Sequence, residues 1–308
     1  MRAHSLQIAA LLLALAGLPS CASSGSGKDG ESDEKFERRI AMPTEEETVG
    51  KLMTDLNGSL VLWANLTMSG DATRDERRTM ALTHDLRYRT NKYKDLLIEQ
   101  LTFGPTPNRI VSAMALGFTG DPEVLGPLLA ALEDSEERVE SNALIGIAVL
   151  ETGDTPTGCL TDRILDHPNE YVRGMAAYAL LYVLRAGATG EGISEAALVG
   201  LGDASPIVRS QSLLVLGEIV HGDDIESIAD LLYDDERFVR KAAMRALSWI
   251  GQQDDHVRGK SARALTAALA KSKSSRDKQA LTANLMKLSS RNHGDDVAEW
   301  LNWANGLP

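Results

Sequence analysis

Apolar residues recur every three or four positions along most of the chain from Thr44 onward, with charged residues between them. This period places the apolar residues on one face of a helix, so it predicts an amphipathic α-helix in nearly every segment. A capping pattern at residues 44–47 predicts the start of a first long helix over 45–69, and a second is expected over 73–103. The expected fold class is all-α.

A longer period is superimposed on the helical one. Five units are counted from a repeated pair, Val-Arg or a variant of it, which starts at residues 108, 139, 172, 208 and 239; a weaker sixth starts near Arg276. This pair opens the second helix of each unit, and a short first helix and an acidic turn precede it. One such hairpin cannot bury its apolar stripe alone, so the hairpins must stack to share a continuous core. Small residues in the second helices let neighbours approach closely; they include Ala143, Gly146, Ala176, Ala179, Ala243 and Ala246.

These units resemble the HEAT repeat, in the short form also found in phycobilisome-lyase-like HEAT proteins. The resemblance covers roughly Thr83 to Ser290. It implies an α-solenoid, a superhelix of about six HEAT-like helical hairpins with a helical cap at each end. We expect an N-terminal helical cap over 44–82, the repeats over 83–294, and a C-terminal cap helix over 295–308.

The first twenty residues have the pattern of a signal peptide, because an apolar run from Leu6 to Leu18 follows a short polar start. The segment Leu18-Pro19-Ser20-Cys21 resembles a bacterial lipobox, which implies cleavage after residue 20 and lipidation of Cys21. A Ser-, Gly- and charge-rich tether is then expected over 21–43. Because Ala22 follows the cysteine, the resemblance implies an outer-membrane anchor that faces the periplasm. The alternative is an ordinary cleaved signal in which Cys21 has no role.

Composition narrows the function classes. The chain has 308 residues and 5% aromatics, and its small aliphatic residues favour packed helices over a β-sandwich. Its net charge of −12 argues against a nucleic-acid partner, because phosphate binding needs a basic surface.

Four arginines recur at the start of the second helices, at Arg109, Arg173, Arg209 and Arg240, together with turn aspartates at Asp134, Asp166, Asp203 and Asp234. The resemblance to HEAT proteins implies an Arg–Asp ladder that joins adjacent repeats. The alternative is a row of anion-binding sites.

A second candidate site lies on the second helices, at the sixth and tenth positions after each unit's start. Residues four apart share a helical face, and the resemblance implies that second helices line the concave side of the solenoid. Aromatic and cationic residues at these positions are candidates for binding a partner; they are Phe118, Tyr178, Tyr182, Arg245 and Trp249. The alternative is that they belong to the core.

Enzyme chemistry has weaker support in the sequence. None of the six histidines is followed by Glu, as the ligands of HEAT-repeat di-iron hydroxylases would require, and Cys159 lies among apolar residues. We therefore expect no metal, no cofactor and no catalytic residue. The sequence favours a lipid-anchored, non-catalytic scaffold or adaptor for another envelope protein. The alternatives are an enzyme or enzyme accessory resembling the lyase-like HEAT proteins, or a purely structural lipoprotein.

Overall fold

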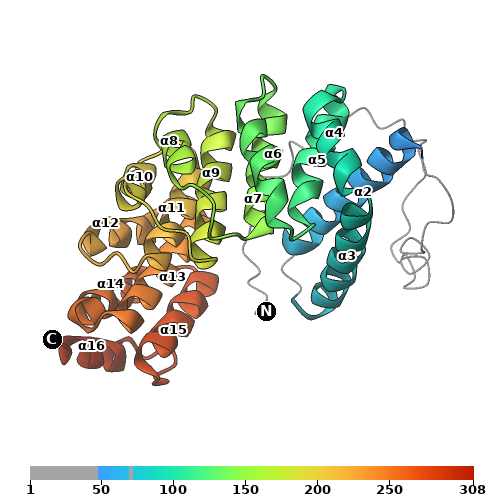
Figure 1. Ribbon diagram of the computed structural model, residues 1–308. Coiled ribbons are helices and arrows are strands. Elements are labelled where there is room, and N and C mark those ends of the chain that lie inside the picture. The colour runs from blue at the N-terminus through green and yellow to red at the C-terminus, as the bar shows by residue number, and fades with distance from the viewer. Residues whose placement is uncertain (1–47, 69–71) are drawn as a thin grey trace. The chain divides into compact units, whose positions relative to one another are not determined.

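The computed structural model describes residues 48–68 and 72–308 (Figure 1). The expected signal peptide, Cys21 and the tether lie outside the described residues. Within them the chain forms the helices α2 to α16, joined by turns and short 3-10 segments, and contains no β-strand. The all-α prediction and the α-solenoid class are confirmed. No helix in this part of the chain is both long and apolar enough to cross a membrane.

The chain divides into two compact units after Leu150. The first unit contains α2 (Val49–Met68), α3 (Ala72–Lys92), α4 (Lys94–Phe103), α5 (Thr106–Gly117), α6 (Leu125–Ala130) and α7 (Glu137–Leu150). Helices α2 and α3 pack as one pair, α4 packs on α5, and α5 packs on α7. Short 3-10 turns flank α6, so the first helix of this repeat is only partly α-helical.

The single helix expected over 73–103 is two helices, which is a correction. The chain breaks at Tyr93, whose φ of −114° and ψ of 23° lie outside the helical region. Leu86 of α3 and Leu97 of α4 are both fully buried. The break lets α3 pack on α2 while α4 packs on α5 as the first helix of a repeat.

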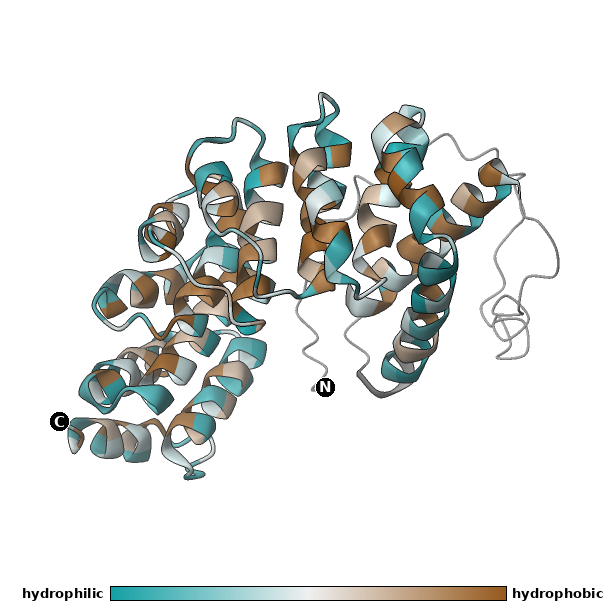
Figure 2. Cartoon of the chain, viewed as in Figure 1, coloured by the Kyte–Doolittle hydropathy of each residue, from teal (hydrophilic) through white to brown (hydrophobic). Residues whose placement is uncertain are grey.

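The second unit contains four hairpins and a final helix. Their bounds are α8 (Gly158–Asp166), α9 (Glu170–Arg185), α10 (Ile193–Gly200), α11 (Pro206–Glu218), α12 (Ile225–Asp230), α13 (Arg237–Gln253), α14 (Asp255–Lys271), α15 (Ser275–Ser289) and α16 (Val297–Asn305). The second helices α9, α11, α13 and α15 pack side by side as one layer. The first helices cover one side of that layer, and Figure 2 shows apolar residues gathered where the two layers meet.

Local sequence fixes where these helices begin. The Asn169 side chain accepts a hydrogen bond from the Tyr171 N–H, and Asp254 and Ser274 cap α14 and α15 in the same way. Pro206 is the first residue of α11, where its missing N–H is not needed. At the end of the chain, α16 packs against α14, and the fully buried Trp300 donates its indole N–H to the Gly294 carbonyl oxygen at 2.9 Å.

Small residues bring the second helices into near-backbone contact. A Cβ atom on Gly146 of α7 would collide with the carbonyl oxygen of Ala113 on α5. In the second unit, a Cβ on Gly217 of α11 would lie 3.3 Å from the Cα of Ala246 on α13. Ala179 and Ala243 are fully buried. Larger side chains at these positions would push the helices apart, because protein interiors are close-packed.

We therefore expect Ala243→Leu to lower the free energy of unfolding by about 1–3 kcal/mol, since three extra carbons must fit into a filled space. The matched control is Ala270→Leu, at an exposed position on α14, which should change stability by less than about 0.5 kcal/mol. Urea unfolding followed by circular dichroism measures both. Equal urea midpoints for the two variants would contradict this packing.

Candidate interaction surface on the second helices

Five aromatic and charged residues of the second unit lie on one side of the layer of second helices. We call this set the second-helix surface; it consists of Tyr182 and Arg185 on α9, Glu218 on α11, and Arg245 and Trp249 on α13. Trp249 is 46% exposed, and the other four are half-buried. Because α9 and α13 both pack against α11, the five residues form one continuous patch.

The structure separates the two candidate positions of each unit. Tyr178 and Leu214, at the sixth position, are buried, whereas Tyr182 and Glu218, at the tenth, are half-buried. The rings of Tyr178 and Tyr182 lie 4.8 Å apart between their centroids. Burial, followed by the neighbouring Tyr182, raises the pKa of Tyr178 well above its usual value, so its hydroxyl stays neutral. Tyr178 thus supports the surface from beneath rather than forming it.

Phe118 belongs to the core instead of a binding surface, which corrects its place among the partner-binding candidates. It is 1% exposed, and its ring meets that of Trp63 edge to face at 5.0 Å between centroids. The reason is that α2, which carries Trp63, packs against α5 and covers this position. No local sequence pattern indicated this cover, because Trp63 precedes Phe118 by more than fifty residues.

An ion pair and a cation–π contact order the α9 side of the surface. The Arg185 Nε donates to the Glu218 Oε2 at 2.8 Å, which joins α9 to α11. The Arg185 guanidinium also lies 5.3 Å from the centre of the Tyr182 ring. Both contacts hold Arg185 in one place at the cost of its side-chain freedom.

Arg245 differs from Arg185 and from the arginines that pair with aspartates in this unit. Burial, and then the nearby charge of Arg185, lower its pKa below the usual value, while Tyr182 and Glu218 act in the opposite direction. An arginine nevertheless remains protonated at neutral pH. Among the described residues, none forms a hydrogen bond or a close ion pair with the Arg245 guanidinium.

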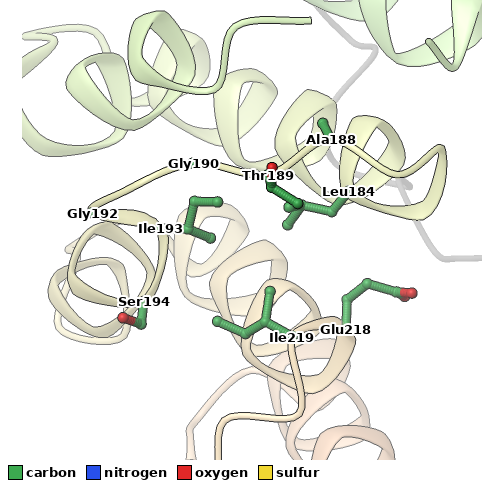
Figure 3. Close-up of a pocket in the computed structure, with 9 residues that line it drawn as sticks. All are labelled: Leu184, Ala188, Thr189, Gly190, Gly192, Ile193, Ser194, Glu218 and Ile219. Carbon is green, nitrogen blue, oxygen red and sulfur yellow. The ribbon is translucent and has the colours of Figure 1, made fainter. Parts of the chain in front are cut away.

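A small cavity of about 370 Å³ adjoins this surface (Figure 3). Leu184, Ile193 and Ile219 surround it, and Glu218 stands at one side. One wall is the loop between α9 and α10, in which Gly187 and Gly192 have φ values of 100° and 72°. Only glycine takes such values without strain, so the loop can turn sharply back over the end of α11.

The repeating arginines form contacts between successive turns. In the second unit, Arg173 binds both carboxylate oxygens of Asp203, at 2.7 and 2.9 Å, and its other terminal nitrogen donates to the His167 carbonyl. Arg209 repeats this pattern with Asp234 and the Asp203 carbonyl. Asp203 also accepts from the Ser205 N–H. Each arginine therefore ties its own turn to the next one with charge-assisted hydrogen bonds.

One end of this ladder differs from the expected set of aspartates. Arg109 pairs with the expected Asp134 inside the first unit, but Arg240 pairs with Asp277 at the start of α15. Asp277 is absent from the expected set of turn aspartates, although it directly follows Arg276, near which the weak sixth unit starts. Asp166 is exposed at the end of α8, and His167 follows it as the capping residue.

Comparison with protein-family models gives the classification. A model of HEAT repeats matches residues 95–181 and 194–286, which is more than half of the chain. The chain belongs to the HEAT-repeat family. No curated protein matches it.

Solved structures with a similar architecture are distant from this HEAT protein. A computationally designed armadillo repeat protein for modular peptide recognition is 20% identical, with a TM-score of 0.44, over 63% of this chain and 99% of its own. Human deoxyhypusine hydroxylase is 20% identical, with a TM-score of 0.37, over 84% of this chain and 96% of its own. An engineered protein is 18% identical, with a TM-score of 0.47, over 64% and 96%.

Groups that could perform chemistry are dispersed in these HEAT repeats. Within residues 48–68 and 72–308, no cluster of three or more His, Cys, Asp or Glu side chains could hold a metal ion. His221 lies 2.9 Å from Asp224 across one turn. The half-buried Cys159 donates its thiol to the Pro156 carbonyl oxygen at 3.1 Å.

The ladder makes stability depend on pH. Burial by itself raises the pKa of Asp203, but the hydrogen bonds from Arg173 and from the Ser205 N–H outweigh it, so the net pKa lies below the usual value. A carboxyl group with a lowered folded-state pKa stabilises the fold above its unfolded pKa of about 4, and this stabilisation is lost as pH falls.

We expect the free energy of unfolding to fall between about pH 5 and pH 3, and to fall less steeply in Arg173→Gln, which lacks the ion pair. The control is Arg276→Gln, which removes an equal charge from an exposed position on α15. Urea titrations at several pH values provide the measurement. A slope in Arg173→Gln equal to that of the wild type would show that the pair does not carry the pH dependence.

Proposed function

We propose that this HEAT protein is a non-catalytic interaction scaffold of the bacterial envelope, which is anchored through an acylated Cys21 and binds a partner protein on its second-helix surface. The observation that carries the proposal is Trp249, a large aromatic residue that stays 46% exposed beside half-buried Tyr182 and Arg245. Trp, Tyr and Arg are the residue types most enriched at binding hot spots.

The rigidity of the surface supports this function. Its side chains project from helices packed on both sides within the second-helix layer, and Arg185 is held by Glu218. Binding side chains that are already ordered lose little freedom when a partner arrives, which favours affinity. Tyr182 and Trp249 also combine a flat apolar body with a polar edge, which suits a protein surface better than a small molecule.

The anchor is proposed from the sequence around Cys21. We expect the full-length protein to incorporate labelled palmitate and to fractionate with the membrane, because each buried acyl CH₂ contributes about 0.8 kcal/mol to anchoring. Cys21→Ser should abolish both. Cys159→Ser is the control for the second cysteine of the chain and should leave both unchanged. Palmitate incorporation into Cys21→Ser would overturn the lipobox interpretation.

The binding surface is tested with two exposed aromatic residues of the same unit. Trp249→Ala should weaken partner binding by at least about 2 kcal/mol, roughly thirtyfold, because hot-spot truncations reach this size. Its effect on stability should stay below about 1 kcal/mol, since the side chain is largely outside the core. The matched control is Tyr233→Ala, at a residue that is 50% exposed and follows α12 in the first-helix layer.

The partner is first captured in intact cells with a photoreactive phenylalanine analogue at position 249 or 233. A discrete crosslinked product is expected from position 249 and not from position 233. Binding of the partner identified in this way is then measured with purified Trp249→Ala and Tyr233→Ala. Equal affinity of the two variants would place the interaction on a different face of the molecule.

A further inference from the structure

The guanidinium of Arg245 is half-buried and has no counter-ion bound to it among the described residues. The four ladder arginines each bind an aspartate, and Arg185 binds Glu218. Arg245 has no comparable contact in the described part of the chain, although it is half-buried on α13. A partly desolvated charge without a partner is costly, because it gives up hydration and gains no hydrogen bond in return.

The neighbours of Arg245 leave its positive charge uncompensated. Glu218 is the nearby carboxylate on α11, but it already accepts the hydrogen bond of Arg185 at 2.8 Å. A second guanidinium beside the first adds repulsion that a further carboxylate would relieve.

An exposed aromatic residue and a cavity also lie near Arg245. Trp249 lies one helical turn beyond Arg245 on the same face of α13. Glu218, whose charge acts on Arg245, also lines the cavity together with Leu184, Ile193 and Ile219. The cation and the exposed indole therefore share one face of α13, and the cavity lies beside Glu218, the carboxylate of α11 that acts on Arg245.

Building on the proposed function, we infer that Arg245 binds the carboxylate of an acidic side chain in an extended segment of the partner protein, and that a nearby apolar side chain of the same segment fills the cavity beside Glu218. The guanidinium offers two parallel N–H donors, which match the two oxygens of one carboxylate. A phosphoryl group fits less well, because it carries nearly two negative charges and Glu218 would repel it.

The inference is tested by panning a displayed library of random twelve-residue peptides against the purified full chain. Enriched peptides should contain Asp or Glu near an aliphatic residue. For a synthetic copy of the best peptide, Arg245→Gln should weaken binding about tenfold or more. The control Arg276→Gln removes the same charge at an exposed position and should leave the affinity unchanged.

A double-mutant cycle then distinguishes a direct contact from a general charge effect. The acidic residue of the peptide is replaced by its amide, and this change should cost about tenfold with the wild-type protein but almost nothing with Arg245→Gln. Equal costs in both proteins would overturn the inference. The melting temperature of Arg245→Gln should equal or exceed that of the wild type, because an unpaired charge has been removed; a clear decrease would assign Arg245 a structural role and also overturn it.

The same peptides distinguish this inference from the proposed function. Peptides that lose affinity with Trp249→Ala but not with Arg245→Gln would refute the carboxylate site and keep the second-helix surface. Peptides whose affinity is unchanged by either substitution would refute both. Peptides without an acidic residue that still bind beside Trp249 would refute the carboxylate site alone.

Discussion

The close approach of second helices is the constraint on which the rest of this protein depends. Gly117 and Gly146 in the first unit, and Gly217 against Ala246 in the second, leave no room for larger side chains between neighbouring backbones. Helices at this distance share a continuous core, so each hairpin is stable only because the next one covers it. The same spacing places the arginine at the start of one second helix within reach of the aspartate in the following turn, as Arg173 and Asp203 show.

Charged residues occur in two regions of the repeats, the turns and the second-helix surface, and they are paired differently in each. At the turns, the arginines bind aspartates that also accept backbone N–H groups, so the charges are matched and the register between hairpins is fixed. On the second-helix surface, by contrast, Arg185 is matched by Glu218 while Arg245 is not. Proteins that bind partners often retain such locally unfavourable groups, because the same feature that costs stability provides recognition.

Trp249 and Phe118 show that the same repeat position can be exposed in one repeat and buried in another. Phe118 occupies the equivalent position in the first unit, yet it is buried against Trp63. One repeat position is therefore buried at Phe118, where an additional helix packs over it, and 46% exposed at Trp249. The long helices before the repeats do more than close the stack, since α2 removes a candidate interaction position from solvent.

The sequence by itself determined the helical class, the presence of stacked HEAT-like repeats, and the four arginines near the start of the second helices, because these features depend on spacing along the chain. Only the tertiary structure decided that the chain breaks at Tyr93 between α3 and α4, that Asp277 completes the ladder, that Tyr178 and Phe118 are buried, and that Arg245 lacks a counter-ion. A repeat period places a residue on a helix, but it does not state which neighbouring helix covers that residue. Exposure and charge pairing arise from contacts between segments far apart in sequence, and these contacts are fixed only when the helices pack.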